Sequence, residues 1–311
     1  MRRLIALAVL LAPLVHAAPA SGWGNEGHLI VCEIALQRLS PRARTFLDAV
    51  RANESEVRDP FRDCPDCAAA HPDDGRAMTF QEGCLWPDES RYDTFKGTYE
   101  YHFINVPAAA ASLDVARDCG RLDCALAGIQ RYTQYLAAAP SASSRERERQ
   151  ALSLRFLGHF VGDLHQPLHV AHAEDLGGNL IEVRFVENGT TVTRSLHAVW
   201  DSTVVQRAGL TAPQAAASAL NAEISSGEAA EWSELSLLDW AGDSMALARA
   251  HAYRRPDGSP VEDGSFLDDD YFRSAIDVVR LRLKQAGVRL AALIEAAAEG
   301  TAPKQLLTLT P

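Results

Sequence analysis

The chain has 311 residues, of which 47% are hydrophobic, so it can bury one large core and we expect a single domain. Its formal net charge of −11 at pH 7 excludes the broadly basic surface of a protein that holds nucleic acid through many phosphates. If the substrate is a polyanion, the attraction must come from a local positive site, such as bound metal ions.

The start of the chain has the features of a secretory signal peptide. A basic start precedes an apolar run that is too short to span a bilayer, and small residues then allow cleavage after Ala20 or after Gly22. We prefer the second position, because it makes Trp23 the N-terminus. These features predict a signal peptide over residues 1–22, a mature domain over residues 23–311, and a secreted or periplasmic protein without membrane insertion.

Helical patterns dominate the mature chain. Apolar residues recur at helical spacing from Asn25 to Leu39, and Ser40-Pro41 begins a second helix. Residues 51–79 are polar and rich in proline, aspartate and cysteine, which favours a disulfide-stapled loop. Further helices are expected over residues 125–139, 146–161, 237–253 and 271–298, with another beginning near Pro213.

One β-hairpin interrupts this helical pattern. The run from Leu180 to Val186 is followed by Asn188-Gly189 and then by Thr190 to Thr193, which is the pattern of two strands joined by a tight turn. The acidic run from Asp268 to Asp270 carries the charge that favours a helix N-terminus. The sequence therefore predicts a mainly α fold, a single all-helical domain with one small β-hairpin.

Six cysteines in an exported chain predict three disulfides, although their spacing does not fix the pairing. Cys119 and Cys124 are close enough for a local loop, and Cys64-Pro-Asp-Cys67 can close on itself, which would leave Cys32 to pair with Cys84. The alternative interpretation of the Cys64 motif is half of a zinc ribbon or a redox motif. That alternative lacks a second matching pair.

Five histidines and three aspartates have the spacing of ligands for several metal ions. The densest stretches are His159-Phe-Val-Gly-Asp163 and His197-Ala-Val-Trp-Asp201, and on a helix the residues four apart share a face. Imidazole nitrogen and carboxylate oxygen are zinc ligands, and eight such side chains are too many for one ion. The full set is His28, Asp88, His102, His159, Asp163, His169, His197 and Asp201. A free α-amine at Trp23 would have an unperturbed pKa of about 8, so a metal could displace its proton.

The order of these motifs resembles the zinc-dependent single-strand nucleases of fungi and plants, the S-one/P-one (S1/P1) nuclease family, and their bacterial relatives. The likeness runs from Trp23 through the C-terminal helix. It implies an all-helical domain of the phospholipase C/zinc nuclease type. The motifs that carry it are Trp23-Gly-Asn-Glu-Gly-His28, Leu85-Trp-Pro-Asp88-Glu-Ser-Arg91, Tyr101-His102-Phe-Ile-Asn105, the run from His159 through Gln166-Pro167 to His169, and His197 to Asp201.

The resemblance implies three Zn²⁺ ions per chain and a set of ligands for each. It places one ion on Asp88, His102, His159 and Asp163, a second on the Trp23 amine and carbonyl, His28 and Asp163, and a third on His169, His197 and Asp201. A zinc-activated hydroxide would then attack phosphorus, and the third ion would stabilise the leaving 3′ oxygen. Asp88, Arg91 and Asp163 would be the catalytic residues.

The same resemblance assigns substrate contacts. Arg91 would bind phosphate, while Phe103 and Asn105 would bind a base that has been unstacked from a single strand. The best-known fungal members have aspartate where this chain has Asn105, and Leu176 replaces an arginine often found before the Gly-Gly-Asn179 motif, in which Asn179 is a further candidate contact. The expected partners are single-stranded DNA and RNA and 3′-nucleotides, and the expected state is a monomer.

Two other functions are compatible with a zinc cluster. A bacterial zinc phospholipase C would share the fold, but those enzymes end the third site with His-x-x-x-Glu, whereas this chain has His197-x-x-x-Asp201. A zinc-storage or adhesion protein would close every coordination position, whereas the expected third site has only three protein ligands. A secreted endonuclease with 3′-nucleotidase activity is therefore the leading hypothesis.

Overall fold

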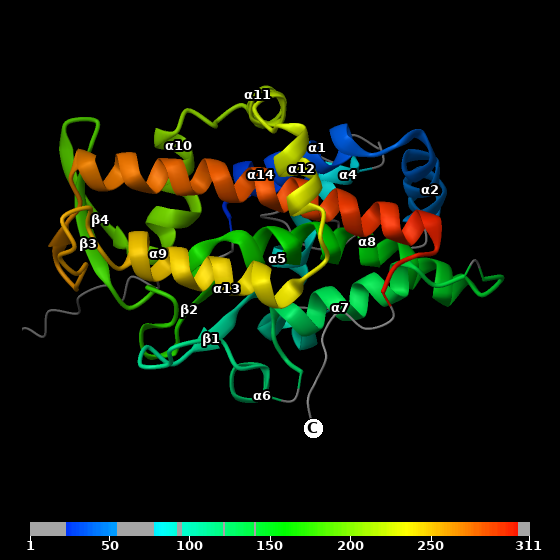
Figure 1. Cartoon of the computed structure of the whole chain (residues 1–311), viewed down its shortest axis with the longest axis horizontal. Helices are drawn as coiled ribbons and strands as arrows, with labels where there is room; N and C mark the ends of the chain where they lie inside the picture. The colour runs from blue at the N-terminus through cyan, green and yellow to red at the C-terminus, as the bar shows by residue number, and fades with distance from the viewer. Residues whose placement is uncertain (1–22, 55–77, 92–94, 121, 140, 304–311) are drawn as a thin grey trace, which may run out of the picture.

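Two long helices, α8 (Ser144–His165) and α14 (Asp269–Glu299), pack against each other along the molecule (Figure 1). The computed structural model describes residues 23–54, 78–91, 95–120, 122–139 and 141–303. The predicted signal peptide, most of the predicted stapled loop and the proposed Cys64–Cys67 pairing lie outside the described residues. The expected mainly α fold is confirmed.

The helices around this pair bring distant segments of the chain together. Helix α1 (Asn25–Arg38) packs against α14, α8 and α11 (Pro213–Ala222), and α7 (Ala125–Leu136) packs along α8. Their boundaries follow local signals. Ser40 accepts a hydrogen bond from Ala43 N at the start of α2 (Pro41–Arg51), as expected for an N-cap.

The acidic run that the sequence places at a helix start does cap α14. The side chain of Asp268 accepts a hydrogen bond of 2.9 Å from the Tyr271 backbone N–H, and the helix ends at Gly300 with a φ of 73°. The other helices that precede α8 are α4 (Phe80–Gly83), α5 (Trp86–Ser90), the 3₁₀ helix η3 (Lys96–His102) and α6 (Val115–Asp118). Those that follow it are η4 (Pro167–His169), η5 (Ala173–Asp175), α9 (Leu196–Ala198), the π-helical turn η6 (Val199–Thr203), α10 (Val204–Arg207), α12 (Ser226–Trp232), α13 (Leu237–Leu247) and a second π-helical turn, η7 (Ala248–Ala252).

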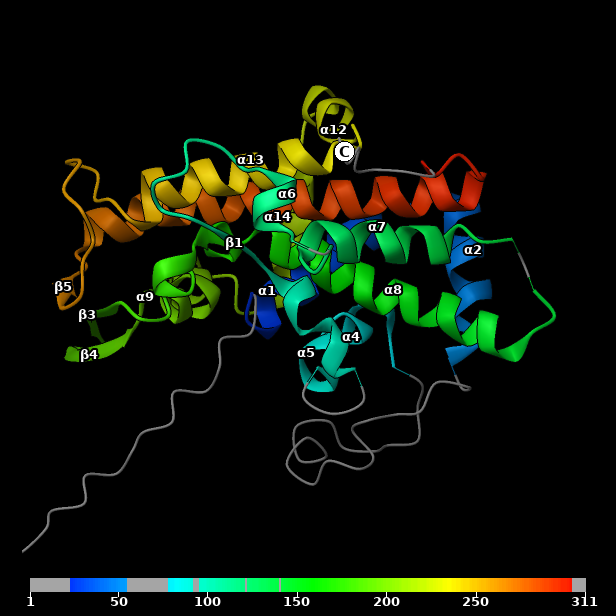
Figure 2. The same ribbon diagram turned by 90° about the horizontal axis from the view of Figure 1, so that it is seen from below.

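Two small sheets complete the fold. The predicted hairpin is present as β3 (Glu182–Glu187) and β4 (Thr190–Ser195), with Glu187 opposite Thr190, and β5 (Ser265–Phe266) extends it. Figure 2 shows this sheet at one end of the molecule, and α2 lies at the other. The second sheet was not predicted. It is a parallel pair of β1 (Ile104–Val106) and β2 (Val170–His172).

Glycines on α8 let α1 approach closely. A Cβ at Gly158 would overlap the sulfur of Cys84, and one at Gly162 would lie 2.8 Å from Nδ1 of His28. Only glycine leaves room for these contacts without displacing a neighbour. The Cys32–Cys84 disulfide then fixes α1 to the residue that follows α4, whereas Cys119–Cys124 closes a local loop before α7.

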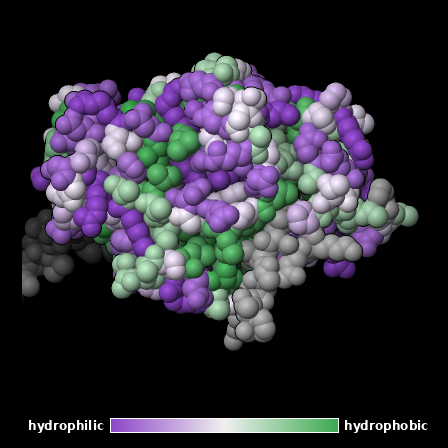
Figure 3. All heavy atoms as spheres, in the orientation of Figure 1, coloured by the Kyte–Doolittle hydropathy of each residue, from purple (hydrophilic) through white to green (hydrophobic). Residues whose placement is uncertain are grey.

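The surface contrasts with this tightly packed interior. Most of the face in Figure 3 is hydrophilic, and hydrophobic residues gather toward its lower middle. Within the described residues, no helix is long and apolar enough to cross a bilayer.

Candidate metal centre

Helix α8 supplies the centre of the site. Every residue of this helix from Ala151 to His165 is buried, as expected for a helix that is covered on all sides. His159 and Asp163 lie one turn apart on it, and Nε2 of His159 is 3.2 Å from Oδ2 of Asp163. A carboxylate placed this deeply needs a positive partner.

Two neighbouring segments add the first group of ligand atoms. Asp88, on α5, has Oδ1 at 3.3 Å from Nε2 of His159 and at 3.5 Å from Nδ1 of His102, which ends η3. Nδ1 of His102 is also 3.0 Å from Nε2 of His159 and 2.9 Å from Oδ2 of Asp163. The structure therefore brings together all four residues expected to share one ion.

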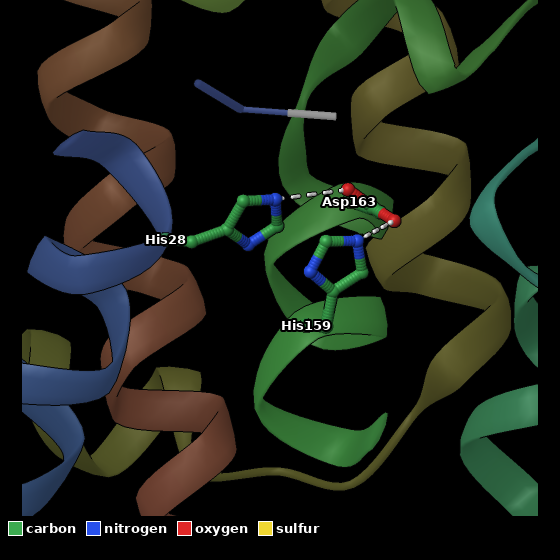
Figure 4. A group of neighbouring side chains, drawn as sticks. All are labelled: His28, His159 and Asp163. Atoms are coloured by element: carbon green, nitrogen blue, oxygen red, sulfur yellow. Dashed lines mark ion pairs between the residues drawn. The ribbon is translucent and has the colours of Figure 1, made fainter. Parts of the chain in front are cut away.

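The second group joins α1 to α8. Figure 4 shows His28, from α1, pointing toward one carboxylate oxygen of Asp163 while His159 points toward the other. The distances are 3.3 Å from Nε2 of His28 to Oδ1 and 3.2 Å from Nε2 of His159 to Oδ2. Asp163 thus faces two groups at once, which is the arrangement of a bridging carboxylate.

Trp23 is fully buried beside this second group. A Cβ at Gly162 would lie 3.7 Å from Cδ1 of Trp23 as well as against His28. The next residue, Gly24, donates its backbone N–H to the carbonyl of Asp201 at 2.9 Å. The segment that contains Trp23 therefore runs between the second group and the residues of the third.

The third group consists of His169, His197 and Asp201. Nε2 of His197 is 3.1 Å from Nε2 of His169 and 3.5 Å from Oδ2 of Asp201. The sequence predicts an α-helical spacing for the last two residues, but Asp201 lies in the π-helical turn η6, where the extra residue per turn changes the direction of the side chain. Such turns occur often at functional sites.

Backbone carbonyls orient the histidines. Nδ1 donates to the carbonyl of Cys84 in His159 (2.8 Å), of His102 in His169 (2.6 Å) and of Gly177 in His197 (2.6 Å). With this assignment, Nε2 of each ring is left to face the other ligands, and it can bind a metal once it carries no proton. Metal-binding histidines are usually held in this way.

Unpaired buried atoms support a metal in the first two groups. Nδ1 of His28 and Nε2 of His102 are buried without a hydrogen bond among the described residues, whereas Nε2 of His28 and Oδ1 of Asp88 and Asp163 have only ion-pair contacts. Buried polar atoms are usually satisfied, so this concentration requires an explanation. Imidazole and carboxylate donors fit Zn²⁺, and a metal ion would satisfy them.

The electrostatics also favour a cation. Burial opposes charge on every group here, yet His159 and His169 hold the pKa of Asp163 well below its usual value. Burial lowers the pKa of His159, but the carboxylates of Asp163 and Asp88 have the larger effect and raise that pKa to about 10. The site therefore stabilises positive charge at this point, whether a proton or a metal ion carries it.

Other ligands are held as neutral imidazoles. Burial lowers the pKa of His102 to about 4 and, together with the nearby His169, that of His197 to about 3. Neutral imidazole is the form that binds metal.

A cleft of about 290 Å³ opens onto the first and third groups. It contains all four residues expected to contact substrate, which are Arg91, Phe103, Asn105 and Asn179. Its other lining residues are Tyr99, His102, Leu168, His169, Leu176, Gly177, Leu180, Ser195 and His197. Ligand atoms and substrate candidates therefore share one concave site.

Arg91 connects the cleft to the ligands. It is only 4% exposed, and its Nη1 lies 2.9 Å from Oδ1 of Asp88. Its guanidinium lies 5.7 Å from the ring centre of Tyr99, which in turn makes an edge-to-face contact with Phe103. Sequence reasoning missed Tyr99, although residues three apart eclipse in a 3₁₀ helix and would place it on the side of His102.

The contacts of Gln166 and His165, which lie between the ligand motifs, could not be predicted from their positions in the sequence. Gln166 donates to Oδ1 of Asp201 at 2.6 Å, so it orients a ligand. His165 lies outside the three groups, because its Nδ1 donates to the carbonyl of Val161 and its Nε2 accepts from Arg289 at 2.8 Å.

A family model described as S1/P1 Nuclease matches residues 23–299. The chain belongs to the S1/P1 nuclease family. The expectation drawn from the sequence motifs is thereby confirmed, and the chain is a member of a family of hydrolytic nucleases.

Individual S1/P1 relatives cover almost the whole chain. Endonuclease 2 of Arabidopsis thaliana is 30% identical over 93% of this chain and 96% of its own length. Nuclease S1 of Aspergillus oryzae is 28% identical over 93% and 96%, and Nuclease P1 of Penicillium citrinum is 29% identical over 86% and 95%. The range matched by the family model includes all the segments that carry candidate ligands.

Proposed function

We propose that this S1/P1 family member is an exported three-zinc phosphodiesterase. It cuts single-stranded DNA and RNA to products with a 5′-phosphate and removes the phosphate from 3′-nucleotides. The observation that carries this proposal is the set of three groups of metal-ligand side chains, the first and third of which open onto a cleft that also contains an arginine and an aromatic ring. The ligands would be those the resemblance implies, with Asp163 shared and with the Trp23 amine and carbonyl completing the second set.

The residues of the chain prepare the phosphate for attack. Zinc, when bound, supplies an activated water nucleophile and neutralises charge on the phosphate and the leaving 3′ oxygen. Arg91 has a planar guanidinium suited to phosphoryl oxygens, and Asp88 fixes its orientation at 2.9 Å. Asp88 and Asp163 would both bind metal. Asp88 would also orient the phosphate-binding arginine.

Base recognition accounts for a preference for single strands. Phe103 is half-buried in the cleft and Asn105 is exposed at the end of the same short segment. An unstacked base can lie against the ring, and the amide can both donate to and accept from its edge. A duplex already stacks its bases and would have to open first.

The acidic surface does not contradict an anionic substrate. Three Zn²⁺ ions held by three carboxylates give a local charge of about +3 within the cleft. Two described disulfides fit an oxidising compartment, which supports export. The proposed protein is a soluble monomer outside the cytoplasm.

The decisive experiment combines metal analysis, N-terminal sequencing and substrate assays of the exported protein. We expect about three zinc ions per chain, a first residue of Trp23, and faster cleavage of heat-denatured than of native DNA. RNA and a 3′-nucleotide should also be hydrolysed. Asp88→Asn should fold normally but lose both the nuclease and the 3′-nucleotidase activity. Cleavage of phosphatidylcholine without cleavage of DNA would instead identify a phospholipase.

A further inference from the structure

The three residues of the third group make orienting hydrogen bonds to different kinds of structure. His169 donates to the carbonyl of His102, next to the β1–β2 pair, and Asp201 accepts from Gln166 at the end of α8. His197 instead donates to the carbonyl of Gly177 at 2.6 Å, and its own backbone N–H donates to Gly178 O at 3.3 Å. Its support is therefore a turn rather than a helix or strand.

This turn has an unusual backbone. Leu176, Gly177 and Gly178 have φ values of 54°, 64° and 82°, so three consecutive residues are left-handed. A leucine in this conformation is strained, because its Cβ lies close to the following carbonyl oxygen. A Cβ at Gly177 would overlap the carbonyl oxygen of Leu168 and lie 3.3 Å from Nδ1 of His197. The turn fits closely against the ligand, yet its own conformation needs to be held by other groups.

Asp175 connects the turn to Tyr253 through one carboxylate oxygen. Its Oδ1 accepts from the backbone N–H of Gly178 at 2.7 Å and from the hydroxyl of Tyr253 at 2.8 Å. The Tyr253 ring stacks on His172 at 4.0 Å, and the carbonyl of His172 accepts from the Gly177 N–H at 2.9 Å. Asp175 therefore binds Gly178 directly, while His172, on which Tyr253 stacks, binds Gly177. These are the two glycines that hold His197.

Tyr253 is itself firmly placed. It follows the π-helical turn η7 and is only 8% exposed, and its backbone N–H donates to the carbonyl of Ala248 at 2.9 Å. The contact thus connects the end of α13 with the turn that supports the ligand. An interaction network of this kind can fix the orientation of an imidazole without touching the metal.

We propose that Asp175 and Tyr253 are positioning residues that stabilise the third metal group by fixing the Gly177–Gly178 turn behind His197. This inference rests on the proposed three-zinc function. The hydroxyl of Tyr253 and the carboxylate of Asp175 act only through the turn, so their loss should loosen one ion and leave the other two in place.

The test uses the full exported protein and stepwise removal of zinc by a chelator. Tyr253→Phe removes one oxygen and keeps the ring that stacks on His172. Asp175→Ala removes both hydrogen-bond acceptors, whereas Asp175→Asn keeps an oxygen acceptor. We expect Tyr253→Phe and Asp175→Ala to lose the first of three zinc ions at about tenfold lower chelator concentration than the wild type, with Asp175→Asn in between. Loss of the second and third ions should be unchanged.

A matched control distinguishes positioning from general loosening. Tyr132 is also 8% exposed and stacked, on Phe156 at 4.3 Å, but it lies on α7 away from the turn. Tyr132→Phe should keep the zinc retention of the wild type. In Tyr253→Phe, excess zinc should restore kcat on a 3′-nucleotide, which would not happen if the fold were damaged.

The outcomes separate this inference from the proposed function. Unchanged zinc retention in Tyr253→Phe and Asp175→Ala, or equal weakening of all three ions, would overturn the positioning role. A wild type that binds three zinc ions and cuts single-stranded DNA would still keep its function in that case. A wild type with fewer than two tightly bound ions or no nuclease activity would overturn the function itself.

Discussion

The ion pair between Arg91 and Asp88 joins a residue of the cleft to a proposed metal ligand. Their separation of 2.9 Å and the burial of Arg91 restrict the guanidinium to one orientation. A lysine would keep the charge but not the planar fork. We expect Arg91→Lys to lower kcat/KM on single-stranded DNA by about 10–100-fold, equivalent to about 1.4–2.7 kcal/mol.

Zinc content distinguishes this effect from loss of the metal. It should be unchanged in Arg91→Lys, and Arg273→Lys, at a side chain that is 71% exposed, should retain full activity. Wild-type kcat/KM in Arg91→Lys would exclude bidentate phosphate binding.

The pKa of His159 makes metal binding depend on pH. With a pKa raised to about 10, this imidazole is protonated at pH 7, and zinc must displace that proton because only neutral imidazole binds metal. We therefore expect zinc affinity to weaken as pH falls, by about tenfold per pH unit for each proton displaced. Calorimetric titration of the chelator-treated protein in buffers of different ionisation enthalpy measures the number of protons released.

Two histidine variants test the assignment of that proton. His159→Gln should release one proton fewer than the wild type. His251→Gln, at a residue that contacts Ser274 outside the three groups, should release the same number. An identical proton count in His159→Gln would show that this side chain is neutral before the metal binds.

At the scale of elements, the close approach of α1 to α8 depends on glycine. Gly162→Ala would place a methyl group 2.8 Å from Nδ1 of His28, too close for an ordinary contact. We expect the ring to shift and one zinc ion to bind at least about tenfold more weakly, as measured by zinc retention against a chelator.

A helical glycine without close neighbours provides the control. Gly242, on α13, has no atom within 4 Å of an added Cβ. Gly242→Ala should keep all zinc and raise stability by up to about 1 kcal/mol, because alanine favours helices. Equal zinc retention in both variants would refute the steric argument.

Most of the elements could be predicted because their signals are local. Ser40-Pro41 begins α2, Asn188-Gly189 turns the hairpin, and Asp268 caps α14. The parallel pair β1–β2 could not, since each strand has three residues, too few to show a period, and the pairing is formed between distant segments. The π-helical turn at Asp201 likewise depends on tertiary packing rather than on a local motif.

The candidate site, too, could be predicted only in part. Its candidate ligands could be proposed from the sequence, because imidazole and carboxylate spacing is visible there and resembles a known family, and the structure brings these side chains together in three groups. The supporting groups were not, because backbone carbonyls such as those of Cys84 and Gly177 have no sequence signature. Nor does a sequence show that Tyr253 reaches a turn that lies 78 positions earlier in the chain.

At the scale of the whole molecule, one disulfide connects segments that carry ligands. Cys32 and Cys84 are 52 positions apart, so the chain-entropy estimate for their crosslink is about 4 kcal/mol. For Cys119 and Cys124, 5 positions apart, it is about 2 kcal/mol. We expect replacement of the first pair by serine to lower the free energy of unfolding more than replacement of the second.

The metal should respond to the same pair of variants. Because Cys32 lies on α1 with His28, and Cys84 both precedes Asp88 and accepts from His159, loss of this disulfide should also weaken zinc retention. Denaturant unfolding and chelator titration check both effects. A larger loss of either quantity for the Cys119–Cys124 pair would contradict this assignment.

The hydrogen bond from Gly24 to Asp201 brings the start of the described chain to its last proposed ligand. Ligands spread over this span cannot meet while the polypeptide is extended, and the first and second groups need α1, α5 and η3 to dock on α8. Under the proposed export, a precursor that crosses a membrane unfolded would therefore have no assembled active site. For the exported nuclease proposed above, cleavage of RNA would begin only after folding had brought the ligand groups together, so the RNA of the producing cell would not be cut during synthesis.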